Sequence, residues 1–198
     1  MNNRGFTLIE ILIAMAVTAM SLVFVAYFVV DISNFGTDLG NRLETEFELQ
    51  LTLRAMISEI RSMGPGGNGA YPIATATPTT FTFYSDIDGD GLFEQVRYFL
   101  DGTVLKKGVT KPTATQPVQY PSADEVISEA VHSMIPGTLF TYYPEGLPDE
   151  MSPLASPVNV ASIRLVNIIG TVDKDTTLPP LPTTLSITAT IRNLRGEI

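Results

Sequence analysis

An uncharged apolar run near the N-terminus limits what this chain can fold into more than any other feature. Twenty consecutive residues, Ile11 to Val30, carry no charge, and only Thr18 and Ser21 interrupt the apolar side chains. About 20 helical residues at 1.5 Å rise cross a hydrocarbon core of about 30 Å. The run therefore predicts a membrane-spanning helix.

The charges on either side of the run predict its orientation. Arg4 precedes it, while Asp31 and Asp38 follow it. Because positive charge is retained on the cytoplasmic side, the N-terminus should stay cytoplasmic and the rest of the chain should be exported. We therefore expect a single-pass protein with its globular part outside the cytosol.

Composition restricts the exported part. With 198 residues the chain can form one ordinary domain beside the anchor, and without cysteine it has neither disulfides nor thiolate chemistry. A net charge of −9 argues against a phosphate-binding surface, since nucleic-acid affinity rests on clustered Lys and Arg. Lys106 and Lys107 are the only adjacent basic pair. We expect no nucleic-acid partner.

Glu10 lies at the start of the apolar run and needs an explanation. A carboxylate in apolar surroundings costs several kcal/mol unless it is paired, so Glu10 is a candidate functional residue. The alternative is a shallow position that reaches the lipid headgroups. A cleaved secretory signal is a further alternative for the apolar run. It would have a shorter apolar core and a small-residue cleavage site after it, and this run fits neither requirement. An ordinary signal anchor explains the length but neither Glu10 nor the Gly5–Phe6 pair before it.

The string "RGFTLIEILIAM", residues 4 to 15, resembles the class III signal of type IV pilins and secretion pseudopilins. The resemblance implies that a prepilin peptidase cuts between Gly5 and Phe6 and that the new terminus is methylated. It also implies that Glu10 neutralises the ammonium at Phe6 of a neighbouring subunit, where an isolated charge would be penalised. The implied location is the bacterial inner membrane, then a pilus or pseudopilus. The implied partners are other major or minor pilins or pseudopilins, an inner-membrane assembly platform and an assembly ATPase.

The exported region resembles the larger minor pilins of the W type and the related J type of type II secretion. The resemblance rests on loose motifs that begin at Phe83 ("FYSDIDGDG"), Tyr98 ("YFL"), Ala130 and Ile163 ("IRLVNI"). It implies a minor subunit that initiates assembly and contacts other minor subunits through its helix.

Hydrophobic periodicity predicts an α+β fold, with one long N-terminal helix packed on an antiparallel sheet. The resemblance to pilins implies the same arrangement. The helix should continue to Met63, with a bend near Gly36 and Gly40. Its apolar face should hold Leu39, Leu43, Phe47, Leu51, Leu53, Ile57 and Ile60. The expected division is a leader at 1–5, a transmembrane and assembly helix at 6–32, an amphipathic helix at 33–63 and an exported β-rich domain at 64–198.

Beyond residue 64 the period changes to two, which is typical of strands. Ser122 and Glu125 have the spacing of a capping box ahead of "VISEAVHSM", which predicts a short helix or a helical turn there. Strands are expected around Phe81 and Phe83, from Leu92 to Leu100 and after a hairpin turn at Asp101–Gly102, then in "TLFTYYPEG", from about Val160 and from Leu185 to Ile191, with irregular chain at 111–121 and 147–157.

The stretch "DIDGDGLFE", residues 86 to 94, begins like a calcium-binding loop. Asp86, Asp88 and Asp90 alternate before Gly91, and Glu94 holds the ninth position. The twelfth position, which should supply a glutamate, is Arg97. The alternative is a plain Asp/Gly turn whose carboxylates cap backbone amides. Calcium is therefore an optional ligand, and no cofactor is required.

Enzymatic activity is not expected. The single histidine, His132, is expected to be a solvated helix residue, and the sequence contains no P-loop. The leading hypothesis is a structural assembly subunit. The alternative is a membrane-tethered or tip-displayed module that binds a ligand or surface through a calcium-dependent hairpin. A tethered hydrolase would need turnover that depends on His132 or the acidic cluster.

Overall fold

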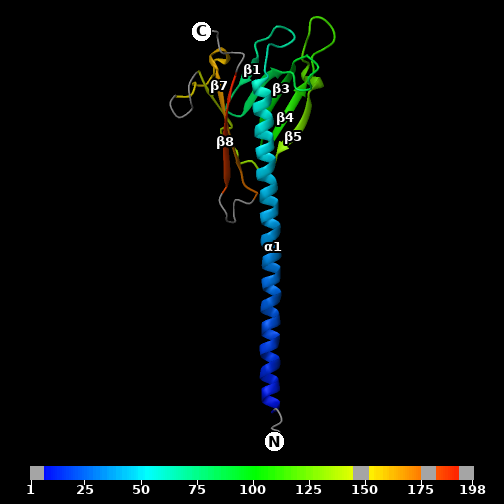
Figure 1. Ribbon diagram of the computed structural model, residues 1–198, viewed down its shortest axis with the longest axis vertical. Coiled ribbons are helices and arrows are strands. Elements are labelled where there is room, and N and C mark those ends of the chain that lie inside the picture. Colours follow the sequence, from blue (N-terminus) through cyan, green and yellow to red (C-terminus); the bar gives the residue numbers. More distant parts are fainter. Residues whose placement is uncertain (1–6, 145–151, 175–181, 192–198) are drawn as a thin grey trace. The chain divides into compact units, whose positions relative to one another are not determined.

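The computed structural model, shown in Figure 1, describes residues 7–144, 152–174 and 182–191. It has the expected α+β fold: a long helix is followed by eight antiparallel strands. The elements are α1 (Leu8–Arg61), β1 (Ile73–Ala76), β2 (Thr80–Ser85), β3 (Glu94–Asp101), β4 (Val104–Thr110), β5 (Val126–Val131), β6 (Phe140–Tyr143), β7 (Leu165–Val172) and β8 (Thr183–Thr190), with 3-10 turns η1 (Ser122–Asp124) and η2 (Val160–Ser162).

The chain divides into two compact units, Met1–Leu43 and Glu44–Ile198. The first consists of the N-terminal part of α1. This part runs through Gly36 and Gly40 as one continuous helix, so the chain does not melt locally at these glycines. An added Cβ would meet no atom within 4 Å at either position. The glycines therefore lower the intrinsic stability of the helix without breaking it.

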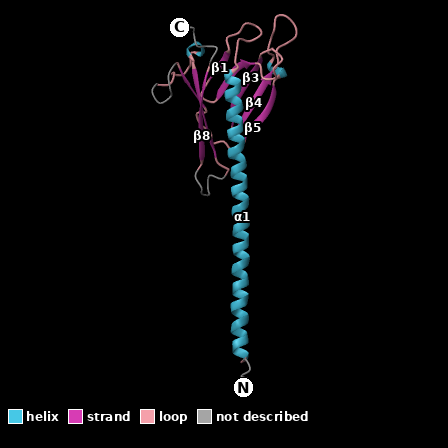
Figure 2. Ribbon diagram, viewed as in Figure 1, coloured by secondary structure: helices cyan, strands magenta, loops and turns pink. Residues whose placement is uncertain are grey.

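The strands of the second unit form two sheets where the sequence predicted one. The first sheet has the order β1-β2-β3-β4-β5 and the second has the order β6-β7-β8. Figure 2 shows the strands in magenta. The division arises because the chain after β5 leaves the first sheet and bonds to the second. The backbone N–H of Ile135 donates to the carbonyl oxygen of Thr171, on β7, at 2.8 Å.

The core of the second unit lies where the two sheets and the C-terminal part of α1 meet. The Phe81 ring of β2 is 5.7 Å from the Phe140 ring and 5.5 Å from the Tyr142 ring, both on β6. These contacts join the sheets through aromatic side chains. The helix contributes the buried residues Leu49, Leu53, Met56, Ile57 and Ile60.

The buried face of α1 differs in part from the predicted one. Leu53, Ile57 and Ile60 are buried as expected, but Leu39, Leu43, Phe47 and Leu51 are exposed. The reason is geometric: residues spaced by four advance about 40° around a helix of 3.6 residues per turn at every step. Phe47 and Leu51 have therefore turned away from the buried face, which Leu49 and Met56 complete. Leu39 and Leu43 are exposed because they lie before Glu44, where the unit that contains the core begins.

Gly170 allows α1 to approach β7 closely. A Cβ added to Gly170 would lie 2.7 Å from Leu49 Cδ1 and 3.3 Å from Leu49 Cδ2. Leu49 is fully buried, so its side chain has little room to move away. A larger residue at this strand position would push the helix off the sheet.

We therefore expect Gly170→Val to lower the free energy of unfolding by about 2–3 kcal/mol through overpacking. Denaturant unfolding of the full chain in detergent would measure the loss. Gly137→Val is the control, because a Cβ there meets no atom within 4 Å. Adding Leu49→Ala to Gly170→Val should recover part of the loss. Equal stability of the two glycine variants would contradict the close approach.

Within "VISEAVHSM", residues Val126–Val131 form strand β5, so the helical prediction is wrong there. Only η1 forms at the predicted helix start, and it has no side-chain cap. The Glu125 carboxylate instead accepts two hydrogen bonds from Arg97, at 2.7 and 2.6 Å. The following residues pair with β4, with Val126 opposite Val109. Pairing with a neighbouring strand thus overrides the local capping signal.

The hairpin between β3 and β4 is one residue out of the predicted register. Asp101 pairs with Val104, so the two loop residues are Gly102 and Thr103. Gly102 has a φ of 61°, which is the requirement of a two-residue turn with glycine in first place. The strands predicted near the C-terminus are confirmed as β6, β7 and β8, although β7 begins only after η2.

Candidate assembly segment and acidic hairpin

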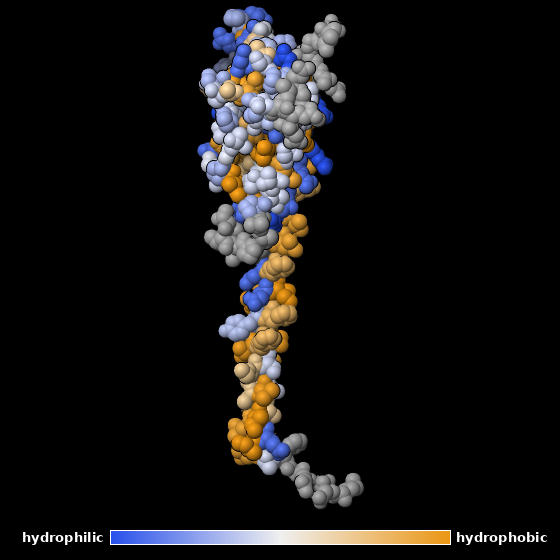
Figure 3. Space-filling view, turned by 90° about the vertical axis from the view of Figure 1, so that its left-hand side faces the viewer, coloured by the Kyte–Doolittle hydropathy of each residue, from blue (hydrophilic) through white to orange (hydrophobic). Residues whose placement is uncertain are grey.

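The N-terminal part of α1 presents apolar side chains on all sides. By length and composition this one helix could cross a membrane, and none of its apolar window is buried. Figure 3 shows apolar residues along this part of the helix. Side chains such as Leu22 and Phe24 are more than two-thirds exposed, at 70% and 73%. An apolar surface of this kind needs lipid or other protein around it.

Glu10 takes part in a capping box at the start of α1. The Thr7 backbone N–H donates to Glu10 Oε2 at 2.8 Å, and Thr7 Oγ1 donates to the same oxygen at 2.9 Å. The Glu10 N–H in turn donates to Thr7 Oγ1 at 3.4 Å. Sequence reasoning missed Thr7, although Thr-x-x-Glu is the spacing of this motif. Gly5 and Phe6, the predicted processing residues, lie outside the described residues.

Residues 1–26 match the family described as "Prokaryotic N-terminal methylation motif". The match covers Gly5, Phe6 and Glu10, and it supports a pilin-like class III signal that prepilin peptidase processes. Together with the apolar helix it is consistent with a membrane-anchored pilin or pseudopilin. No curated protein and no solved structure matches the chain.

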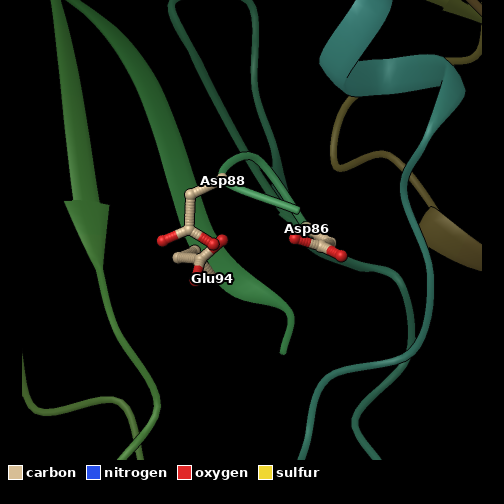
Figure 4. Close-up of side chains that lie close together, drawn as sticks. All are labelled: Asp86, Asp88 and Glu94. Atoms are coloured by element: carbon tan, nitrogen blue, oxygen red, sulfur yellow. The ribbon is translucent and has the colours of Figure 1, made fainter. Parts of the chain in front are cut away.

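The β2–β3 connection brings together three of the four predicted calcium ligands. Ligand oxygens of Asp86, Asp88 and Glu94 all lie within 4.8 Å of one another (Figure 4). The turn that folds them together contains Gly89 and Gly91, whose φ values of 76° and 86° favour glycine. Asp90 is not part of the group; its Oδ1 accepts a hydrogen bond from the Leu92 N–H at 2.8 Å.

The two aspartates of this group already have protein donors. Asp86 accepts hydrogen bonds from the N–H groups of Gly89 and Gly91, at 2.7 and 3.0 Å. Asp88 Oδ2 lies 2.6 Å from Lys111 Nζ. The hydrogen bond from Lys111 is the largest cause that lowers the pKa of Asp88. Lys111 follows β4, and no spacing in the sequence pointed to it.

Glu94 is the buried member of the group, with only 1% of its surface exposed. Its Oε2 accepts a hydrogen bond from the Ile87 N–H at 3.1 Å. Its Oε1 is buried and, among the described residues, has no hydrogen-bond partner. Burial is the main cause that raises the pKa of Glu94. Arg97, at the loop position where a glutamate was needed, pairs with Glu125 instead.

His132 lies in a bend after β5, so its predicted helical position is wrong, whereas its exposure is confirmed. Its Nε2 lies 3.1 Å from Glu129 Oε2, and its Nδ1 lies 3.7 Å from Glu48 Oε2. The hydrogen bond with Glu129 is the largest cause that raises its pKa. The surroundings of His132 thus favour its charged form, which bridges β5 to α1.

A polar network that sequence reasoning missed ties the end of α1 to the first sheet. Lys107 Nζ donates to Glu59 Oε1 at 2.6 Å, and Tyr98 Oη donates to Glu59 Oε2 at 2.9 Å. The side chains of Lys107 and Glu59 are only 21% and 15% exposed. The neighbouring Lys106 pairs with Asp101, whose side chain is 60% exposed.

The two adjacent lysines should therefore differ in their effect on stability. We expect Lys107→Ala to lower the free energy of unfolding by about 1–3 kcal/mol, because Glu59 loses its charged partner in a largely buried site and keeps only the Tyr98 hydroxyl. Lys106→Ala should change little, since solvent screens its pair. Thermal unfolding of both variants in detergent would compare them, and equal losses would contradict the importance of the Glu59 network.

Proposed function

We propose that this chain is a minor pilin-like structural subunit. Prepilin peptidase processes it, and it then enters or initiates a type IV pilus or a type II secretion pseudopilus. The observation that carries the proposal is Glu10, a carboxylate at the head of a fully exposed apolar helix, inside the N-terminal methylation motif. The partners are prepilin peptidase, other pilin or pseudopilin subunits, and the membrane platform and ATPase of the system.

The apolar side chains of the N-terminal part of α1 are exposed on every side, so a single copy is stable only with lipid around this part of the helix. In a filament, neighbouring helices would replace the lipid. Cleavage before Phe6 would create an ammonium near the apolar region, and Glu10 of the next subunit carries the charge that neutralises it. The glutamate then sets the register between subunits.

The globular unit supports a structural role. Its polar contacts, such as Glu59 with Lys107 and Arg97 with Glu125, join secondary-structure elements to one another. We propose no catalytic step for it. The resemblance to W-type and J-type subunits supports a minor, initiating position and not the position of a bulk filament subunit.

A second candidate is a membrane-tethered or tip-displayed binding module. The observation that favours it is the acidic hairpin, where three carboxylates converge on the exposed β2–β3 connection. The two candidates separate experimentally. Loss of surface or ligand binding in a variant of Asp86, Asp88 and Asp90 that still assembles would favour the binding module.

The test of the leading proposal is the N-terminal mass of the protein recovered from membranes with and without an active prepilin peptidase. The expected result is a mature chain that begins at methylated Phe6 when the peptidase is present and an intact Met1 terminus when it is absent. An uncut terminus under both conditions would overturn the proposal. A signal-anchored binding module would then be the better account.

A further inference from the structure

Glu94 Oε1 is a buried oxygen that has no hydrogen-bond partner among the described residues, and this needs an explanation. Burying an acceptor without a hydrogen bond costs about 1–3 kcal/mol, and more if the group is charged. Apart from Glu94 Oε1, the described residues include no buried side-chain nitrogen or oxygen that lacks a partner. Because Glu94 is only 1% exposed, the unpaired oxygen marks a place where a ligand belongs.

The carboxylate that carries this oxygen belongs to an acidic group, which shows which kind of ligand fits. One carboxylate oxygen each from Asp86, Asp88 and Glu94 lie within 4.8 Å of one another. Three carboxylates at this distance repel each other unless positive charge lies between them. Calcium binds oxygen at about 2.3–2.6 Å, so two ligands of one ion can be about 5 Å apart. Magnesium at about 2.1 Å allows only about 4.2 Å.

One cation already contacts the group, from outside. Lys111 Nζ reaches Asp88 Oδ2 at 2.6 Å, and the lysine side chain is 68% exposed. Such a side chain can leave at small cost, because exposed ion pairs are weak. The ammonium neutralises Asp88 but leaves Glu94 Oε1 unpaired. A divalent ion between the three carboxylates would neutralise Asp88 and also give Glu94 Oε1 a partner.

We propose that Asp86, Asp88 and Glu94 form a calcium site that fixes the β2–β3 connection. The ligands are hard oxygens, which suit calcium, and water would complete the coordination. Asp90 stays outside, in its contact with the Leu92 N–H. This proposal does not depend on assembly into a filament, so either one can fail without the other.

The experiment is calcium titration of the full chain in detergent, after chelator treatment, by isothermal titration calorimetry. We expect one ion per chain and a Kd on the order of 0.1–1 mM, the range of extracellular calcium modules. Asp86→Asn and Glu94→Gln should each weaken binding at least about tenfold. Asp90→Asn removes an identical charge from the same turn and should leave the Kd unchanged.

Lys111→Met gives a test in the opposite direction. Removing the competing ammonium from Asp88 should tighten calcium binding several-fold, a gain that misfolding cannot produce. Circular dichroism without calcium checks that each variant is folded. If Glu94→Gln does not fold, Asp86→Asn and Lys111→Met still show whether calcium binds at this site.

Four results would overturn the proposal. The first is no binding at 10 mM calcium, about 10-fold above the weakest expected Kd, and the second is magnesium binding as tight as calcium binding. The third is an equal loss of calcium affinity in Asp90→Asn and Asp86→Asn. The fourth is unchanged or weaker calcium binding in Lys111→Met.

Discussion

Gly5→Val should abolish removal of residues 1–5 and leave the protein in the membrane with its Met1 terminus. Gly5 lies at the predicted cut, within the segment that matches the N-terminal methylation motif. Glycine has no Cβ, so the bond that follows it is unusually open to an enzyme. Valine adds a branched side chain directly beside that bond and restricts its rotation. The substitution should therefore act at the cleavage step and leave the folded part of the chain unaffected.

The N-terminal mass of the membrane-bound protein, with prepilin peptidase present, measures this effect. Asn3→Ala changes the same leader away from the cut and should be processed like the unsubstituted chain. If Gly5→Val yields a normal methylated Phe6 terminus, the cleavage site is elsewhere and the assignment of Gly5 is wrong.

Glu10→Gln should be processed normally yet enter filaments at least about 100-fold less often. Breaking a buried charge pair by removal of one partner costs about 3–5 kcal/mol, and each 1.4 kcal/mol is tenfold. The capping box makes this variant informative. Glutamine can still accept the hydrogen bond from the Thr7 N–H, so the start of α1 is kept while the charge is lost.

Thr7→Ala is the converse variant. It removes the hydroxyl that bonds to Glu10 Oε2 but keeps the carboxylate. We expect it to enter filaments nearly as well as the unsubstituted chain. The fraction of subunit in sheared filaments, compared with the fraction in membranes, measures both variants. If Glu10→Gln assembles normally while Thr7→Ala does not, Glu10 acts as a helix cap and not as a charge.

The features predictable from the sequence are those encoded by neighbouring residues. The membrane-length helix follows from an unbroken run of apolar side chains, and β8 follows from the alternation of Leu185, Ile187 and Ala189. The end of α1 was equally local, since the helix was expected to continue to Met63 and ends at Arg61. In each case the signal lies within one element, so no distant partner is needed to read it.

What could not be predicted depends on contacts between distant segments. The strand character of β5 comes from pairing with β4, and the split into two sheets comes from bonds such as that between Ile135 and Thr171. In the acidic hairpin, spacing identified four carboxylates, but the turn at Gly89 and Gly91 decides that Asp90 stays apart. Lys111 joins them only because β4 lies beside β3.

The N-terminal part of α1 is exposed, whereas its C-terminal part packs on the sheets. This difference determines where the chain can be truncated. All of the buried helix residues, from Leu49 to Ile60, lie after Glu44, where the second unit begins. A truncation just before Glu44 would discard the apolar stretch and keep the part of the helix on which the sheets pack. A truncation at Arg61, the natural end of the helix, would instead remove one wall of the core and leave the strands without it.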